Sequence, residues 1–118
     1  MQRLTIFVAG LVGAAGVALA AAGAHLAPGG NLTIASTMLM IHAAALLALA
    51  GRPLPWGALQ RIALVALLVA LLLFCGDLSL RAMADTRLFP GAAPIGGSLL
   101  IVAWLTIAAS AFGTNGRE

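Results

Sequence analysis

Two groups of polar residues interrupt otherwise apolar stretches and could carry chemistry. The first is His42, about ten residues into a long apolar run. An ionisable side chain at such a depth in a bilayer is costly, and by default it marks a site that handles a proton or a ligand. The structural alternative is a neutral imidazole that bonds a hydroxyl or carbonyl on a neighbouring helix and so locks the helices together.

The second group is Asp77 with Arg81, four residues further on. This spacing places both side chains on one face of a helix. The pair predicts either an ion pair near the membrane interface or a site for a cation or proton. His25 ends another apolar run on the same side of the membrane, so His25, Asp77 and Arg81 could meet. This cluster and His42 are the candidate polar sites.

Catalytic arrangements are not supported by the same residues. A bis-histidine haem fails because His42 would lie roughly 15 Å deeper than His25, at a rise of about 1.5 Å per residue. A metal site lacks convergent ligands. The single Cys75 excludes an internal disulfide, and it is typical of a small core residue rather than a nucleophile. We expect no enzyme activity, no cofactor and no metal.

Composition indicates that the chain lies in lipid rather than in water. Of the 118 residues, 63% are hydrophobic and 8% are charged, whereas a soluble domain carries about a quarter charged residues. Each membrane span needs roughly 20 apolar residues, and only helices satisfy the backbone of such a segment in lipid. We therefore predict an all-α integral membrane protein, a single four-helix transmembrane bundle with short loops and helices over residues 4–24, 32–50, 62–80 and 94–111.

The first run also fits a secretory signal peptide, with a short basic start and the small-residue site Ala18-Leu19-Ala20. The run from Leu4 to Ala24 is longer than the apolar region of such a signal. A membrane span is the preferred interpretation.

Arginine positions predict the orientation. With four spans, both termini share a side with the second loop, and that side holds four of the six arginines: Arg3, Arg52, Arg61 and Arg117. Arg81 and Arg87 lie on the other side. The excess predicts cytoplasmic termini. Because the arginines form no patch, we expect no nucleic acid partner. Trp56 fits an interface anchor, whereas Trp104 lies in the middle of its run.

Small residues recur at helical spacing and predict packing faces, because helices in lipid approach closely only where side chains are small. Such positions occur in the first and fourth runs: Gly13, Gly16, Ala20, Gly23, Gly96 and Ala103. The third run carries Ala63, Ala66 and Ala70 on the line that reaches Asp77.

Four short motifs, one for each helix, resemble a known family when taken together. They are Ala22-Gly23-Ala24-His25, Met40-Ile41-His42-Ala43, Phe74-Cys75-Gly76-Asp77 and Ala93-Pro94-Ile95-Gly96-Gly97. The chain resembles the YgdD-like family of small membrane proteins, domain of unknown function 423. The resemblance implies a four-helix protein of the bacterial inner membrane without an assigned activity. Leu39 and Asp77 depart from the family pattern, which tends to place a glutamine and a small hydroxyl residue there.

These features favour a non-enzymatic bundle that acts by association with itself, with membrane lipid or with a larger membrane complex. The alternative is a small transporter or channel that uses His42 and the cluster of His25, Asp77 and Arg81. Only His42 lies deep in a span, and transporters usually carry more intramembrane polar groups and broken helices.

Overall fold

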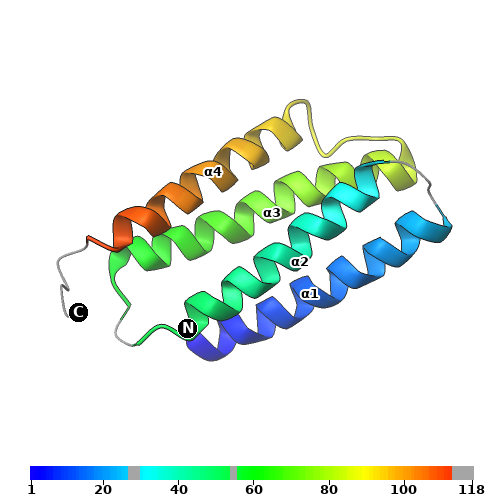
Figure 1. The fold of residues 1–118 in the computed structure, drawn as a ribbon. Coiled ribbons are helices and arrows are strands. Elements are labelled where there is room, and N and C mark those ends of the chain that lie inside the picture. The colour runs from blue at the N-terminus through cyan, green and yellow to red at the C-terminus, as the bar shows by residue number, and fades with distance from the viewer. Residues whose placement is uncertain (27–29, 54–55, 113–118) are drawn as a thin grey trace.

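The structure, a computed structural model, describes residues 1–26, 30–53 and 56–112. These residues form four helices and no strand (Figure 1): α1 (Gln2–His25), α2 (Gly30–Ala50), α3 (Ala58–Ala84) and α4 (Ala92–Ser110). All four are long and apolar enough to cross a membrane. The prediction of an all-α protein with four membrane-spanning helices is therefore confirmed.

Three helices begin and end within two residues of the predicted bounds, but α3 is four residues longer at each end. The predicted end at residue 80 is therefore too early, since Arg81 and the residues to Ala84 belong to the helix. Arg, Ala and Met are all good helix formers, so polarity alone does not end the helix. It ends at Asp85, which adopts a left-handed conformation with φ of 50°. The Thr86 N–H then bonds the Leu80 carbonyl at 3.4 Å, as at many helix C-termini.

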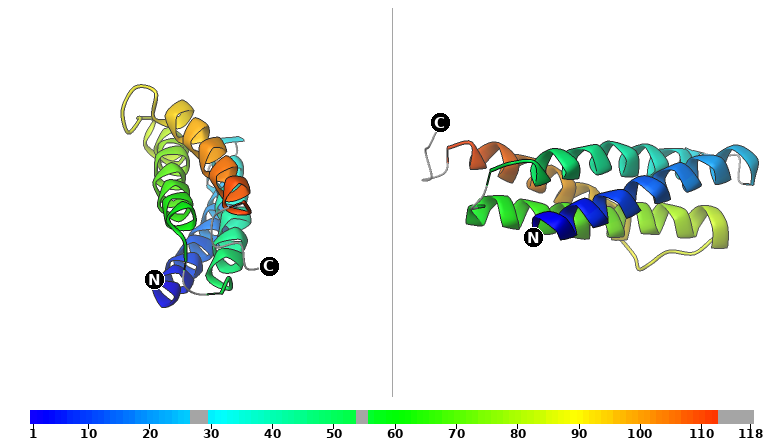
Figure 2. Two further views of the ribbon diagram at one scale, coloured as in Figure 1. Left: turned by 90° about the vertical axis from the view of Figure 1, so that its left-hand side faces the viewer. Right: turned by 90° about the horizontal axis from the view of Figure 1, so that it is seen from below.

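The helices pack in chain order and form an open assembly. Within the described residues α1 packs on α2, α2 on α3 and α3 on α4, and no other pair of helices comes into backbone contact. The two central helices each bury nine residues, whereas α1 buries three and α4 buries five. The views in Figure 2 show this arrangement end-on and from below. Both outer helices thus have a large uncovered surface.

Glycines allow the closest helix contacts. A Cβ atom added to Gly16 would lie 2.7 Å from Met40 Cγ in α2. The same addition at Gly96 would lie 2.6 Å from the Phe74 nitrogen and 3.0 Å from the Ala70 oxygen in α3. Contacts below 3.0 Å are not tolerated without movement, so these two glycines set the spacing of their helix pairs.

The other predicted packing residues lie at the same two interfaces or close to them. Added Cβ atoms at Gly13 and Gly23 would lie 3.6 and 3.3 Å from the Cβ atoms of Ala43 and Leu32 in α2. Ala103 is fully buried on α4. Ala20 is half-buried on α1.

Side chains from α1 and α3 cap the C-terminal end of α2, whose last carbonyls have no partner within the helix, and a third side chain bonds the loop that follows. Gln2 Nε2 donates to the Ala50 oxygen at 2.6 Å, and Gln60 Nε2 donates to the Leu49 oxygen at 3.3 Å. Trp56 Nε1 donates to the Arg52 oxygen at 3.2 Å. Trp56 is only 5% exposed, so it closes the core beneath the α2–α3 loop. The expectation that it anchors the chain among headgroups is wrong.

Candidate functional site

His42 is held on α2 by hydrogen bonds at both ring nitrogens. Nδ1 lies 2.7 Å from the Met38 oxygen, one helical turn earlier, and Nε2 lies 3.1 Å from Nε1 of Trp104 on α4. A carbonyl only accepts and an indole N–H only donates. Nδ1 must therefore carry the proton and Nε2 must be bare. In this geometry both ring nitrogens of the buried imidazole are occupied by hydrogen bonds.

Trp104 is the partner that sequence reasoning missed. Its ring centroid lies 5.8 Å from that of His42, with the two ring planes at 60°. A signal was present, because an indole N–H in the middle of a span finds no acceptor in lipid and needs one in the protein. His42 offers a side-chain acceptor in the middle of its own span, at a similar depth. The two mid-span positions taken together would have predicted that Trp104 and His42 form a pair.

Asp77 is fully buried on α3 and joins two segments. Its Oδ2 lies 2.8 Å from Arg81 Nη2, and its Oδ1 accepts the Leu88 N–H at 3.0 Å. Asp77 and Arg81 are close enough to form an ion pair, but their atoms are not aligned as a hydrogen bond requires. Among the described residues, Oδ2 and Arg81 Nε therefore have no hydrogen-bonding partner. The carboxylate ties the loop between α3 and α4 back onto the end of α3.

His25 does not join this pair. It is exposed at the end of α1 and makes no hydrogen bond or ion pair with Asp77 or Arg81 within the described chain. The predicted cluster of three is wrong in this respect. The physical reason is the open assembly, since α1 packs on α2 alone and the end of α1 is not brought against α3.

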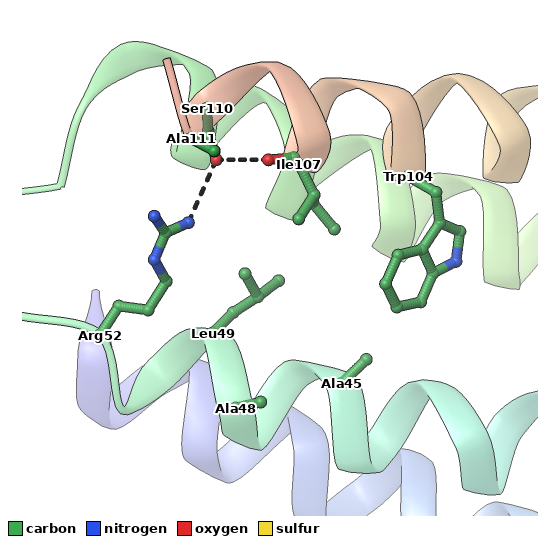
Figure 3. Close-up of a pocket in the computed structure, with 8 residues that line it drawn as sticks. All are labelled: Ala45, Ala48, Leu49, Arg52, Trp104, Ile107, Ser110 and Ala111. Carbon is green, nitrogen blue, oxygen red and sulfur yellow. Dashed lines mark hydrogen bonds between the residues drawn. The ribbon is translucent and has the colours of Figure 1, made fainter. Parts of the chain in front are cut away.

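A groove lies between α2 and α4, the two helices that Trp104 and His42 bridge. It has a volume of about 340 Å³. Figure 3 shows its lining, which is almost entirely apolar: Ala45, Ala48, Leu49, Arg52, Trp104, Ile107, Ser110 and Ala111. At one end Arg52 Nη1 donates to Ser110 Oγ at 3.2 Å, and Ser110 Oγ donates onward to the Ile107 oxygen at 2.6 Å.

The remaining reactive groups do not converge. The described residues contain no group of three His, Cys, Asp or Glu side chains placed to hold a metal ion. Cys75 is buried, with Sγ 3.6 Å from the Ala35 oxygen. The arrangement therefore offers paired polar groups that fix helices in place and apolar hollows that suit binding. Besides the groove between α2 and α4 with Arg52, a shallower hollow is lined by Arg61, Ile62, Val65, Ala66, Val69 and Leu99.

Comparison with known proteins gives one match. A family model described as a protein of unknown function, DUF423, matches residues 19–97, which are 79 of the 118 residues. The matched part includes His25, His42, Asp77 and Arg81, and it ends before Trp104. No curated protein matches the chain, and no solved structure matches it either.

Proposed function

The chain belongs to the DUF423 family, whose function is unknown, and we propose that it is a non-enzymatic protein of the bacterial inner membrane that acts by association. Its partners would be membrane lipid, a second copy or a larger membrane complex. The observation that carries the proposal is the open assembly, in which α1 and α4 each pack on a single helix. A protein whose outer helices have one neighbour each presents two faces that another membrane component must cover.

The uncovered face of α1 has the composition that helix association in lipid requires. A Cβ atom added to Gly10 would meet no atom within 4 Å, and Ala14 and Ala18 are exposed on the same side. Small residues at this spacing let a second backbone approach closely, which supplies the van der Waals contact that drives association in lipid. This face supports self-association or docking on a complex.

The arginine distribution supports a cytoplasmic location for both termini. The start of α1 and the end of α4 lie at the same end of the molecule, together with the α2–α3 loop (Figure 1). Arg52 belongs to that loop and Arg61 to the first turn of α3. We call this end the terminal end.

A transporter is less well supported. Transport sites at mid-membrane usually combine discontinuous helices with polar groups that can accept a substrate. Here His42 already uses both ring nitrogens, and Asp77 is paired with Arg81. The four described helices are each continuous.

Two measurements on one preparation test the proposal. The protein is extracted from native membranes in polymer-bounded nanodiscs and weighed by native mass spectrometry, and the same protein is reconstituted in liposomes with an internal pH-sensitive dye. We expect a retained second copy, lipid or membrane partner, and no proton flux above that of empty liposomes. Proton flux that disappears in His42→Leu would overturn the proposal in favour of transport.

A further inference from the structure

The groove between α2 and α4 has the form of a site for one acyl chain. Ala45 on α2 and Arg52, two residues beyond the end of α2, are seven positions apart, about 10 Å at the rise of an α-helix. The hydrocarbon of one leaflet is about 15 Å deep. The groove therefore covers roughly two-thirds of a leaflet, from the terminal end toward the middle of the bilayer. Its volume of about 340 Å³ lies within the range of small-molecule sites.

The end of the groove at the membrane interface carries a positioned cation. Arg52 is half-buried, and its backbone is fixed by the bond from Trp56 while its guanidinium is fixed by the bond to Ser110. Ser110 accepts from Arg52 and donates to Ile107, so it holds the guanidinium and leaves the other Arg52 donors for a ligand. A guanidinium offers several donors in a planar fork that matches phosphate oxygens.

Trp104 lines the opposite end of the groove (Figure 3), and its indole N–H is already bonded to His42. The inner part thus offers only apolar surface: Ala45, Leu49 and Ile107 are its other wall residues. A ligand that suits the groove is apolar along about 10 Å and anionic at one end.

We propose that this groove binds an anionic phospholipid of the leaflet at the terminal end, with one acyl chain between α2 and α4 and the phosphate at Arg52. The inference rests on the proposed function, since it names the lipid class with which the protein associates. Ala48 and Ala111 are exposed at the sides of the groove, so a lipid can enter laterally without unfolding either helix.

The test is lipid titration of the detergent-solubilised protein, followed by native mass spectrometry. Phosphatidylglycerol is compared with phosphatidylcholine of the same acyl chains. We expect phosphatidylglycerol to bind more tightly and Arg52→Gln to reduce that preference about tenfold or more, because the variant loses a charge-assisted hydrogen bond to the phosphate. The matched control is Arg3→Gln, which removes the same charge at the terminal end from an exposed position on α1.

A second pair of variants tests the groove itself. Ala48→Phe fills the space from an exposed position and should weaken binding of both lipids. Ala58→Phe makes the same change at an exposed position on α3 outside the groove, and it should leave lipid binding unchanged. The proposal would be overturned if the wild type and Arg52→Gln showed the same preference for phosphatidylglycerol over phosphatidylcholine. It would also be overturned if Arg3→Gln lost as much of that preference as Arg52→Gln. Unchanged lipid binding in Ala48→Phe would also overturn it.

The experiment separates this inference from the proposed function. A dimer that dissociates in Ala48→Phe would show that a second copy occupies the groove, which overturns the lipid site but leaves association intact. Proton flux lost in His42→Leu overturns the proposed function whatever the lipid result.

Discussion

Gly96 gives the sharpest test of how α3 and α4 pack. In Gly96→Ala the new methyl group would lie 2.6 Å from the Phe74 nitrogen and 3.0 Å from the Ala70 oxygen. Both are helix backbone atoms, so neither can turn aside, and α4 must shift away from α3. Overpacking of this kind costs about 1–3 kcal/mol. Replacing glycine by alanine in a helix gains up to about 1 kcal/mol, so the gain offsets only part of the cost.

Gly97→Ala is the matched control, because an added Cβ there would meet the Phe74 ring atoms Cδ2 and Cε2 at an ordinary 3.7 Å. The propensity gain is common to both variants and cancels in their difference, which should equal the overpacking cost of about 1–3 kcal/mol. The free energy of unfolding is measured by denaturing detergent titration in mixed micelles. If Gly96→Ala is as stable as Gly97→Ala, the close approach of α4 to α3 is refuted.

The helix contacts give three further predictions, and the arginine distribution gives one. Asp77→Ala should destabilise the protein by about 1–3 kcal/mol more than Asp85→Ala, because it leaves a loop N–H and a cation without an acceptor; equal melting temperatures would contradict this. A double-mutant cycle with His42→Leu and Trp104→Phe should give a coupling energy of about 0.6 kcal/mol, with about 1.7 as the upper limit; additive effects would show that the bond stabilises nothing. Gly16→Leu should separate α1 from α2, so that cysteines introduced on the buried face of α1 react faster with a thiol reagent. Labelling rates equal to those without Gly16→Leu would refute the close packing of α1 on α2. A reporter that works only in the cytoplasm should be active when it is fused at the C-terminus. Activity of a reporter that works only in the periplasm would show that the predicted orientation is wrong.

The spans could be predicted because lipid imposes a simple rule on composition and length. Three helices begin and end close to where apolar residues begin and end. The bounds of α3 differ because hydropathy reports where a helix leaves the hydrocarbon, whereas the helix continues until the backbone is forced to turn. At Asp85 that turn is the left-handed conformation, which the sequence does not make obvious.

The site could be predicted only where its partners lie on one helix. Asp77 and Arg81 are four residues apart, so their pairing follows from helical geometry alone. Pairing across helices depends on which helices touch, and four apolar helices can pack in several orders. For this reason His25 was placed in a cluster that it does not join, and Trp104 was not matched with His42.

The separation of α2 and α4 follows from the side chains between them. Their backbones do not come into contact, yet two hydrogen bonds span the gap, one from Trp104 to His42 and one from Arg52 to Ser110. Trp104 and Arg52 both have long side chains, so each can reach across the gap between the helices. In the hydrocarbon the Trp104 N–H finds no acceptor except one that the protein supplies. The two bonds join α4 to α2 and to Arg52, just beyond the end of α2, while Ala45 and Ala48 between them leave the intervening space unfilled. The groove thus lies where small side chains on α2 separate two long side chains that reach across the gap.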